Sequence, residues 1–226
     1  ILMRLMARNF KRAVSDEQKN EKTALITSAA EKLFESDKFE RITIEKIAKQ
    51  AGIAKGTVFI YFKTKEEIFL SIAEKETANW KKHLTEAITS ACVKDKKITV
   101  EVLCNILISS LENNNFIKLI SILDDTLEQN IDFKKALHFK KYVKSEMQEI
   151  SALIEASSGT LKPGNGIIII NSLYTCAIGA YKVSNPSDTV KKITKRPGME
   201  IFDRNFYDLM HHISMCYIKG FIASDS

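Results

Sequence analysis

The chain has 226 residues, of which 45% are hydrophobic and 27% are charged, which is ordinary for a globular protein of one large or two small domains. Its eight Gly and three Pro are few, and its many Lys, Glu, Ile, Leu and Ala residues predict a mostly helical fold. The net charge is +6, and the four cysteines (Cys92, Cys104, Cys176 and Cys216) form no C-x-x-C pair. This spacing argues against a zinc site or a disulfide framework and predicts reduced, buried thiols in a cytoplasmic protein.

The positive charge is concentrated at the N-terminal end. Residues 1–65 hold 14 Lys and Arg against 8 Asp and Glu, an excess of six that equals the net charge of the whole chain. A local excess of this kind favours a polyanionic partner, with nucleic acid first, although a merely solvated basic surface gives the same count.

The first residues, ILMRLMARNF, lack the long apolar run and cleavage site of a signal peptide. Because they also lack an initiator Met, we expect residues 1–15 to be an extension that is disordered or foreign to the native chain. The first helix is expected from about Asp16 to Ser36, where apolar residues recur at helical spacing.

Two short helices are expected next. Thr43 is a plausible N-cap for a helix that ends at Gly52, a residue suited to a left-handed C-cap. The second begins two residues later, in the stretch KGTVFIYFKTK (55–65). Thr64 and Glu67 then have the spacing of a capping box, which predicts the start of a long helix to about residue 91.

Further helices are expected at 98–113, 115–129, 132–157, 165–183 and 200–222. The most apolar window, 166–181, is shorter than the roughly 20 residues of a membrane span, and we interpret it as a core helix. The last two helices bury more apolar surface than one monomer needs, which predicts a homodimer interface, with a monomer core as the alternative. The interface residues expected are Ile170, Leu173, Ala177, Tyr181, Phe206, Met210 and Tyr217.

The stretch 55–65 is the second helix of a helix-turn-helix candidate. On a helical wheel with Val58 at zero, Phe62 lies at about 40°, whereas Gly56, Ile60 and Thr57 lie at about 160°, 200° and 260°. Ile60 is therefore expected to point away from the core, above a glycine that has no side chain. Such a face is a poor surface for water and a suitable one for the major groove of DNA. A small helical corner packed on another part of the domain is the alternative.

The segment from Thr43 to Phe69, TIEKIAKQAGIAKGTVFIYFKTKEEIF, resembles the DNA-binding segment of the tetracycline-repressor (TetR) family of bacterial transcription regulators. The resemblance implies an all-α homodimer in which three N-terminal helices bind DNA and a larger helical domain binds a small-molecule effector. By position, the family's DNA contacts fall on Thr43, Lys55, Gly56, Thr57, Phe59, Ile60, Tyr61 and Lys65. Two residues depart from the pattern: Ala54 replaces a capping Ser or Thr, and Phe59 stands where Tyr is common.

The resemblance and the pattern together predict an all-α protein with an extension (1–15), a helix-turn-helix domain (16–65) and a ligand-binding and dimerisation domain (66–226). We expect a homodimeric transcriptional regulator, acting as a repressor, that binds a palindromic double-stranded DNA operator and is released by an apolar or amphipathic effector. The alternative is a helical ligand-binding or interaction module whose DNA binding has degenerated. The expected pocket residues, each of which is also a plausible core residue, are Trp80, Phe116, Phe139, Tyr142, Met147 and Tyr174.

Catalytic and metal-binding patterns are missing from the sequence. His211 and His212 are adjacent and lack the i, i+4 spacing of a metal-binding pair on a helix. We find no phosphate-binding loop, dinucleotide fingerprint or nucleophile elbow. No enzyme activity, cofactor, metal or membrane partner is therefore expected.

Overall fold

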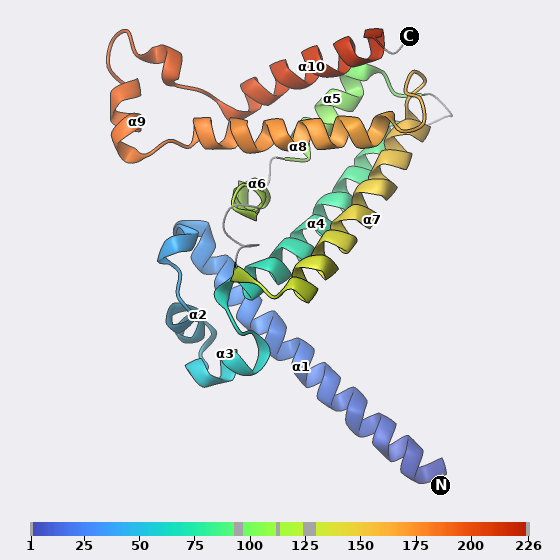
Figure 1. Cartoon of the computed structure of the whole chain (residues 1–226), viewed down its shortest axis with the longest axis vertical. Coiled ribbons are helices and arrows are strands. Elements are labelled where there is room, and N and C mark those ends of the chain that lie inside the picture. Colours follow the sequence, from blue (N-terminus) through green and yellow to red (C-terminus); the bar gives the residue numbers. More distant parts are fainter. Residues whose placement is uncertain (1, 93–96, 112–113, 124–129, 225–226) are drawn as a thin grey trace. The chain divides into compact units, whose positions relative to one another are not determined.

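The structure is a computed structural model that describes residues 2–92, 97–111, 114–123 and 130–224. The chain divides into two compact units, residues 1–72 with 125–133 and residues 73–124 with 134–226. The division falls inside the long helix α4 (Lys65–Ala91), which contributes residues to both units (Figure 1). The fold is all-α, as predicted, and the described residues form helices without a strand.

The first unit contains α1 (Leu2–Ser36), the short 3-10 helix η1 (Phe39–Arg41), α2 (Ile44–Ala51) and α3 (Lys55–Tyr61). The predicted start of the first helix near Asp16 is too late, since α1 already begins at Leu2. Residues 2–36 contain no Gly or Pro to interrupt a helix, so the backbone continues through the segment that we expected to be an extension.

The core of the first unit is aromatic. Phe69, from the first turns of α4, is completely buried, and its ring packs edge-on against Phe34 of α1 and Phe39 of η1, with centroids 5.2 and 4.9 Å apart. Edge-to-face pairs at this distance are favourable beyond the apolar area that they bury. Ile26, Ile42 and Ile47 are also fully buried, and they bring residues of α1 and α2 into the same core.

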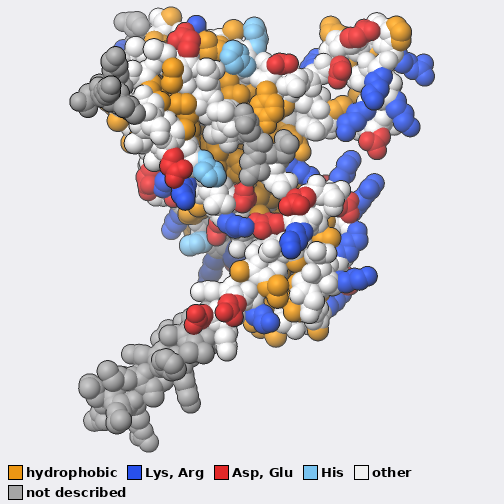
Figure 2. All heavy atoms as spheres, turned by 180° about the vertical axis from the view of Figure 1, so that it is seen from behind, with side chains coloured by type: hydrophobic (Ala, Val, Ile, Leu, Met, Phe, Trp, Pro, Cys, Tyr) orange, Lys and Arg blue, Asp and Glu red, His pale blue; other side chains and the backbone are white. Residues whose placement is uncertain are grey.

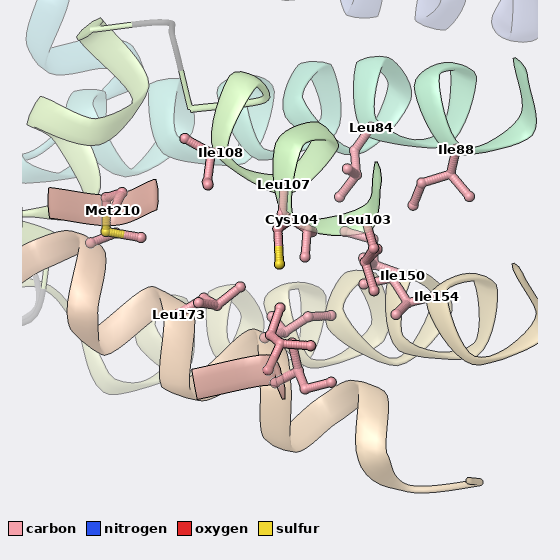
Figure 3. Packing of buried hydrophobic residues seen from close by; sticks show 14 of the residues in the cluster. Leu84, Ile88, Leu103, Cys104, Leu107, Ile108, Ile150, Ile154, Leu173 and Met210 are labelled. Carbon is pink, nitrogen blue, oxygen red and sulfur yellow. The ribbon is translucent and has the colours of Figure 1, made fainter. Parts of the chain in front are cut away.

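The second unit holds the rest of α4 and the helices that follow it. Their bounds are α5 (Val100–Ser109), α6 (Asn114–Ile120), α7 (Phe133–Ser157), α8 (Asn165–Ser184), α9 (Asp188–Thr194), η4 (Glu200–Phe202) and α10 (Phe206–Ser224). Buried side chains of α4, α5, α7, α8 and α10 form one continuous apolar core (Figure 3). The helices predicted at 132–157 and 165–183 are confirmed as α7 and α8. Helix α5 is shorter than the predicted helix at 98–113. The helix predicted at 115–129 is observed as α6 in its first part, and its second part lies largely outside the described residues.

Two contacts fix the start of α8 against α7. Its N-cap, Gly164, has no capping side chain, and the Glu155 carboxylate of α7 instead accepts hydrogen bonds from the N–H groups of Gly164 (2.9 Å) and Gly166 (2.8 Å). A Cβ on Gly166 would lie 2.5 Å from the carbonyl oxygen of Ser151, so only glycine fits at this crossing.

Helix α8 is long and apolar enough to cross a membrane by length and composition alone. Its Ile169, Leu173 and Ala177 side chains are buried in the core of the second unit. The core helix of a soluble protein satisfies the same length and composition criteria, but 33% of the apolar window of α8 is buried, so one face of the helix packs into this core and the interpretation of 166–181 as a core helix stays a prediction.

The cysteines differ from the prediction in one respect. All four are free thiols, but only Cys104 is buried, and Cys216 on α10 is exposed. Burial, the largest cause, raises the pKa of the Cys104 thiol to about 11.

Candidate DNA-binding surface and ligand cavity

The helix-turn-helix of the first unit has the predicted caps. The Thr43 hydroxyl accepts a hydrogen bond from the Lys46 N–H at 3.3 Å and so caps α2, and Gly52 ends α2 in the left-handed conformation, with φ of 67°. At the start of α4, the Thr64 hydroxyl accepts from the Glu67 N–H (3.2 Å), and the Glu67 carboxylate accepts from the Lys63 N–H (2.8 Å). These local interactions hold α3 between two fixed turns.

Helix α3 has one buried face and one open face, as the wheel predicts. Val58 is completely buried and Phe62 nearly so, whereas Ile60 is 77% exposed and Phe59 47% exposed. A Cβ added at Gly56 would meet no atom within 4 Å, so this part of the helix is also open. The exposed face of α3 therefore consists of Gly56, Phe59 and Ile60. Thr57, which the wheel places on the outward face, is instead partly buried, as is Tyr61.

The two lysines predicted as phosphate contacts lie in different surroundings. The Lys55 ammonium pairs with the Glu45 carboxylate of α2 and lies 5.9 Å from the centre of the Phe59 ring, at the edge of the open face. The hydrogen bond from Lys55, the largest cause, lowers the pKa of Glu45. An incoming phosphate can take Lys55 from this exposed pair at little cost.

Lys65 is instead tied into the core of the first unit. Its ammonium donates hydrogen bonds to the carbonyl oxygens of Phe39 (2.9 Å) and Ile42 (3.2 Å) and lies 4.0 Å from the centre of the Phe39 ring. These bonds tie Lys65 to the segment where η1 leads into α2, and the Phe39 oxygen also accepts from the Ile42 N–H at 3.1 Å. This geometry favours a structural role for Lys65 over the predicted role as a phosphate contact.

The N-cap of α3 is Ala54, which makes no side-chain capping bond, as the sequence indicates. Basic side chains gather along the outer edge of the first unit (Figure 2). Exposed lysines that the prediction did not select, Lys49 on α2 and Lys63 in the turn before α4, add to the positive charge near α3.

The second unit contains a cavity of about 510 Å³ with mostly apolar walls. Its walls come from α4, α5, α6, α7, α8 and α10. Five of the six residues predicted for a pocket line it: Trp80, Phe116, Phe139, Met147 and Tyr174. Tyr142 does not, since its hydroxyl donates to the Glu74 carbonyl oxygen at 3.1 Å and bridges α7 and α4.

Trp80 is held at the cavity wall by two contacts. Its indole N–H donates to the Ser110 hydroxyl (2.9 Å), and its ring stacks on Phe116 with centroids 5.5 Å apart. Near it, the Lys81 ammonium binds the carboxylates of Glu146 and Glu149 on α7. These bonds join α4 and α7 along the cavity.

Several residues proposed for a dimer interface are buried within the second unit. Ile170, Leu173, Ala177 and Met210 are at most 8% exposed and line the cavity, so they are not available to a partner in this conformation. Tyr181, Phe206 and Tyr217 are partly buried against the same core. The large exposed apolar side chains of this region lie on other residues, namely Ile168, Val183, Val190, Ile193, Met199, Ile201 and Phe202.

A helix-turn-helix unit followed by a helical unit with an apolar cavity defines a class of ligand-responsive DNA-binding regulators. Family models that match the chain identify the family within this class. Residues 26–72 match the tetR family of bacterial regulatory proteins, and residues 74–225 match the tetracyclin repressor-like C-terminal domain. The chain belongs to the tetR family of transcription regulators and not to an enzyme family.

Curated relatives share parts of the chain. The fatty acid metabolism regulator protein of Bacillus subtilis is 31% identical over 85 residues, which cover 38% of this chain and 44% of that protein. The regulator EthR of Mycolicibacterium smegmatis is 36% identical over 55 residues, which cover 24% of this chain and 25% of that protein. The matches thus span less than half the length of either relative.

Solved structures resemble the fold over most of the chain. A tetR-family protein from Mesorhizobium loti has a TM-score of 0.58 at 15% identity, covering 91% of this chain and 97% of the other. FadR of Bacillus subtilis, solved in complex with stearoyl-CoA, has a TM-score of 0.50 at 18% identity, covering 83% of this chain and 96% of the other. At these identities the likeness shows a shared fold.

Proposed function

We propose that the protein is a cytoplasmic repressor that binds a palindromic operator as a homodimer and is released by an apolar or amphipathic small molecule. The observation on which the DNA-binding part rests is Ile60, an aliphatic side chain left 77% exposed on α3 beside the open Gly56. A partner that covers this side chain would gain the hydrophobic free energy of removing it from water. The methyl groups of thymine in the major groove offer that cover.

The cavity supports the effector part of the proposal. Cavities of about 300–1,000 Å³ with apolar walls and a few polar groups are typical of small-molecule sites, and this one has about 510 Å³. The relative from Bacillus subtilis that binds stearoyl-CoA makes fatty-acyl compounds suitable first probes.

Helix α4 provides a route for coupling. It begins at Lys65 in the DNA-binding unit, and its residues Thr77 and Trp80 line the cavity. A ligand that displaces Trp80 would strain the bonds that join α4 to α7 and change the spacing of the two recognition helices in a dimer. Half-sites on DNA lie about 34–36 Å apart, so a change of spacing weakens binding.

Homodimerisation is supported by exposed apolar residues around α8 and the α8–α10 connection. Ile201 is 75% exposed and Phe202 is 52% exposed, in addition to Val183 at the end of α8. We expect sedimentation at micromolar concentration to show a dimer. Ile201→Asp should shift it toward monomer without unfolding, while Val102→Asp, at an exposed position on α5, should leave the dimer intact.

Selection from a random pool of DNA duplexes tests the proposed function. We expect the protein to enrich a palindrome with half-sites about one helical turn apart. Enrichment of no sequence would favour the alternative of a ligand-binding module without operator recognition.

A further inference from the structure

His212 and Cys216 form an exposed pair on α10. The Sγ atom of Cys216 lies 3.9 Å from the Nε2 atom of His212, one turn earlier on the helix, and both side chains are exposed. Residues four apart share one face of an α-helix, so the helix itself brings the thiol and the imidazole together. The adjacent His211 and His212 lack the i, i+4 spacing of a metal-binding pair, whereas His212 and Cys216 have it.

The pair has the chemistry and the separation of two ligands on one metal ion. Thiolate sulfur and imidazole nitrogen are the ligands that Zn²⁺ and related thiophilic ions prefer in proteins. A tetrahedral zinc ion, with bonds of about 2.3 Å to sulfur and about 2.0 Å to nitrogen, places these two atoms about 3.5 Å apart. Small rotations of two exposed side chains can close the observed 3.9 Å to this value. On binding, the Cys216 thiol releases its proton to solvent, and neutral His212 binds through the Nε2 lone pair.

One chain supplies half of such a site. No group of three or more His, Cys, Asp or Glu side chains within the described residues is placed to hold a metal ion. Asp208, one turn before His212, is therefore not a third ligand in this conformation. Lys219, at the next turn, is bound to Glu101 of α5 at 2.7 Å. Structural zinc sites almost always have four ligands, so the remaining positions are open to another molecule.

The outward face of α10 can admit a second copy of the same helix. Helix α10 packs on α5 and α8 (Figure 1). On a helical wheel, His212 and Cys216 lie at about 160° and 200° from Ser214, so they point away from the core that buries Ser214 completely. Gly220 and Ala223 are exposed on the same side, and a Cβ added at Gly220 would meet no atom within 4 Å. Small side chains at these positions let the axis of another helix come close.

We propose that His212 and Cys216 form half of a metal site that two copies of the chain share, with a thiophilic divalent cation of the zinc type as its ligand. The same two side chains of the second copy complete the tetrahedron, because an isologous contact places the same surface of both subunits together. The ion then joins α10 of one protomer to α10 of its partner. This inference rests on the proposed homodimer and adds to it a site outside the cavity.

Cobalt is the probe, because Co²⁺ takes the same ligands as zinc and absorbs visible light. We expect titration of the full chain with Co²⁺ under argon to produce a thiolate-to-cobalt absorption band. The band should reach its end point at one ion per pair of chains, as four ligands from two copies require. Added Zn²⁺ should displace the cobalt, since nitrogen and sulfur sites bind zinc more tightly.

Four variants separate the two ligands from their neighbours. Cys216→Ser should remove the band, and His212→Ala should weaken cobalt binding by at least about 10-fold, a loss that even residues supporting a metal ligand produce. The controls are His211→Ala, at the adjacent exposed histidine, and Cys176→Ser, at the partly buried thiol of α8, and both should bind as wild type does. Because His212 and Cys216 are exposed, their metal-free variants should melt at the wild-type temperature, which shows that they fold.

Sedimentation and alkylation add readouts that a passive surface pair would not move. Zn²⁺ should tighten the association of wild type by at least about 10-fold, leave that of Cys216→Ser unchanged, and protect Cys216 from alkylation. The absence of a thiolate band, a band that survives in Cys216→Ser, or an end point at one ion per chain would each overturn the shared site. A metal-free dimer that binds no cobalt would overturn this inference and leave the homodimer proposal standing.

Discussion

Val58 and Ile60 are two residues apart on α3 and lie on opposite faces of it, with exposed fractions of 0% and 77%. Because one side chain is buried and the other is exposed, truncating them should affect the free energy of unfolding to different extents. Val58→Ala should lower the free energy of unfolding by about 1–3 kcal/mol, since it opens a cavity in the core of the first unit. Ile60→Ala should change it by less than about 0.5 kcal/mol. Chemical denaturation measures both, and a large loss for Ile60→Ala would place that side chain in the core.

Lys65 should contribute to the stability of the first unit, whether or not it also contacts DNA. Lys65→Ala removes the donors to the carbonyl oxygens of Phe39 and Ile42, so we expect a loss of about 1–3 kcal/mol in the free energy of unfolding. Lys49→Ala, at an exposed position on α2, is the control and should change stability little. Unchanged stability of Lys65→Ala together with weaker binding to every DNA would restore the role of a phosphate contact.

Replacing two glycines of α8 with alanine should change the stability of the protein in opposite directions. Gly166→Ala forces a Cβ to within 2.5 Å of the Ser151 carbonyl oxygen, so α7 and α8 must separate, at a cost of about 1–3 kcal/mol. Gly179→Ala meets no atom within 4 Å and should stabilise the same helix by about 0.5–1 kcal/mol. Thermal unfolding of the two variants decides, and equal effects would contradict the close crossing at Gly166.

The thiols of Cys104 and Cys216 should differ in reactivity. Cys104 is buried with its pKa raised to about 11, whereas Cys216 is exposed. At pH 8 an alkylating reagent should modify Cys216 in the native protein and reach Cys104 only after unfolding, because the thiolate is the reactive form. Mass spectrometry of the peptides identifies the sites, and early modification of Cys104 would show that the core opens.

The raised pKa of Cys104 also makes the free energy of unfolding depend on pH. Between its usual value of 9.0 and about 11, the unfolded thiol loses its proton and the folded one keeps it. The folded state therefore binds more protons, and this group makes the free energy of unfolding fall as pH rises through that range. Comparing the pH slopes of wild type and Cys104→Ala isolates the contribution, and identical slopes would contradict the raised pKa.

The helix-turn-helix could be predicted from the sequence because its determinants are local. Thr43, Gly52 and Thr64 fix helix ends through bonds within a few residues, and the wheel of α3 depends only on spacing. Helix α9 was missed because it has seven residues and lies between Pro186 and Pro197 in a stretch that reads as a loop, although Ser187 caps it by accepting from the Val190 N–H.

The cavity could be predicted only in part. The aromatic residues of the long helices were natural candidates, but Ser214 and Met210 reach the wall because α10 packs beside α5 and α8, which spacing along the chain does not reveal. The same packing buries Ala177, so its small size serves the core of the second unit. The bonds of Lys65 to two distant carbonyl groups had no signal in the sequence.

The most direct measurement is the affinity of wild type and Ile60→Ala for the selected operator and for a scrambled duplex of the same length, by fluorescence anisotropy at fixed salt. We predict that wild type prefers the operator by at least about 1,000-fold. Ile60→Ala should lose about 1–3 kcal/mol on the operator and much less on the scrambled duplex. Replacing the contacted thymine with uracil should reproduce most of that loss in wild type and little in the variant. Equal losses on both duplexes, or no preference by wild type, would contradict sequence reading by the open face of α3.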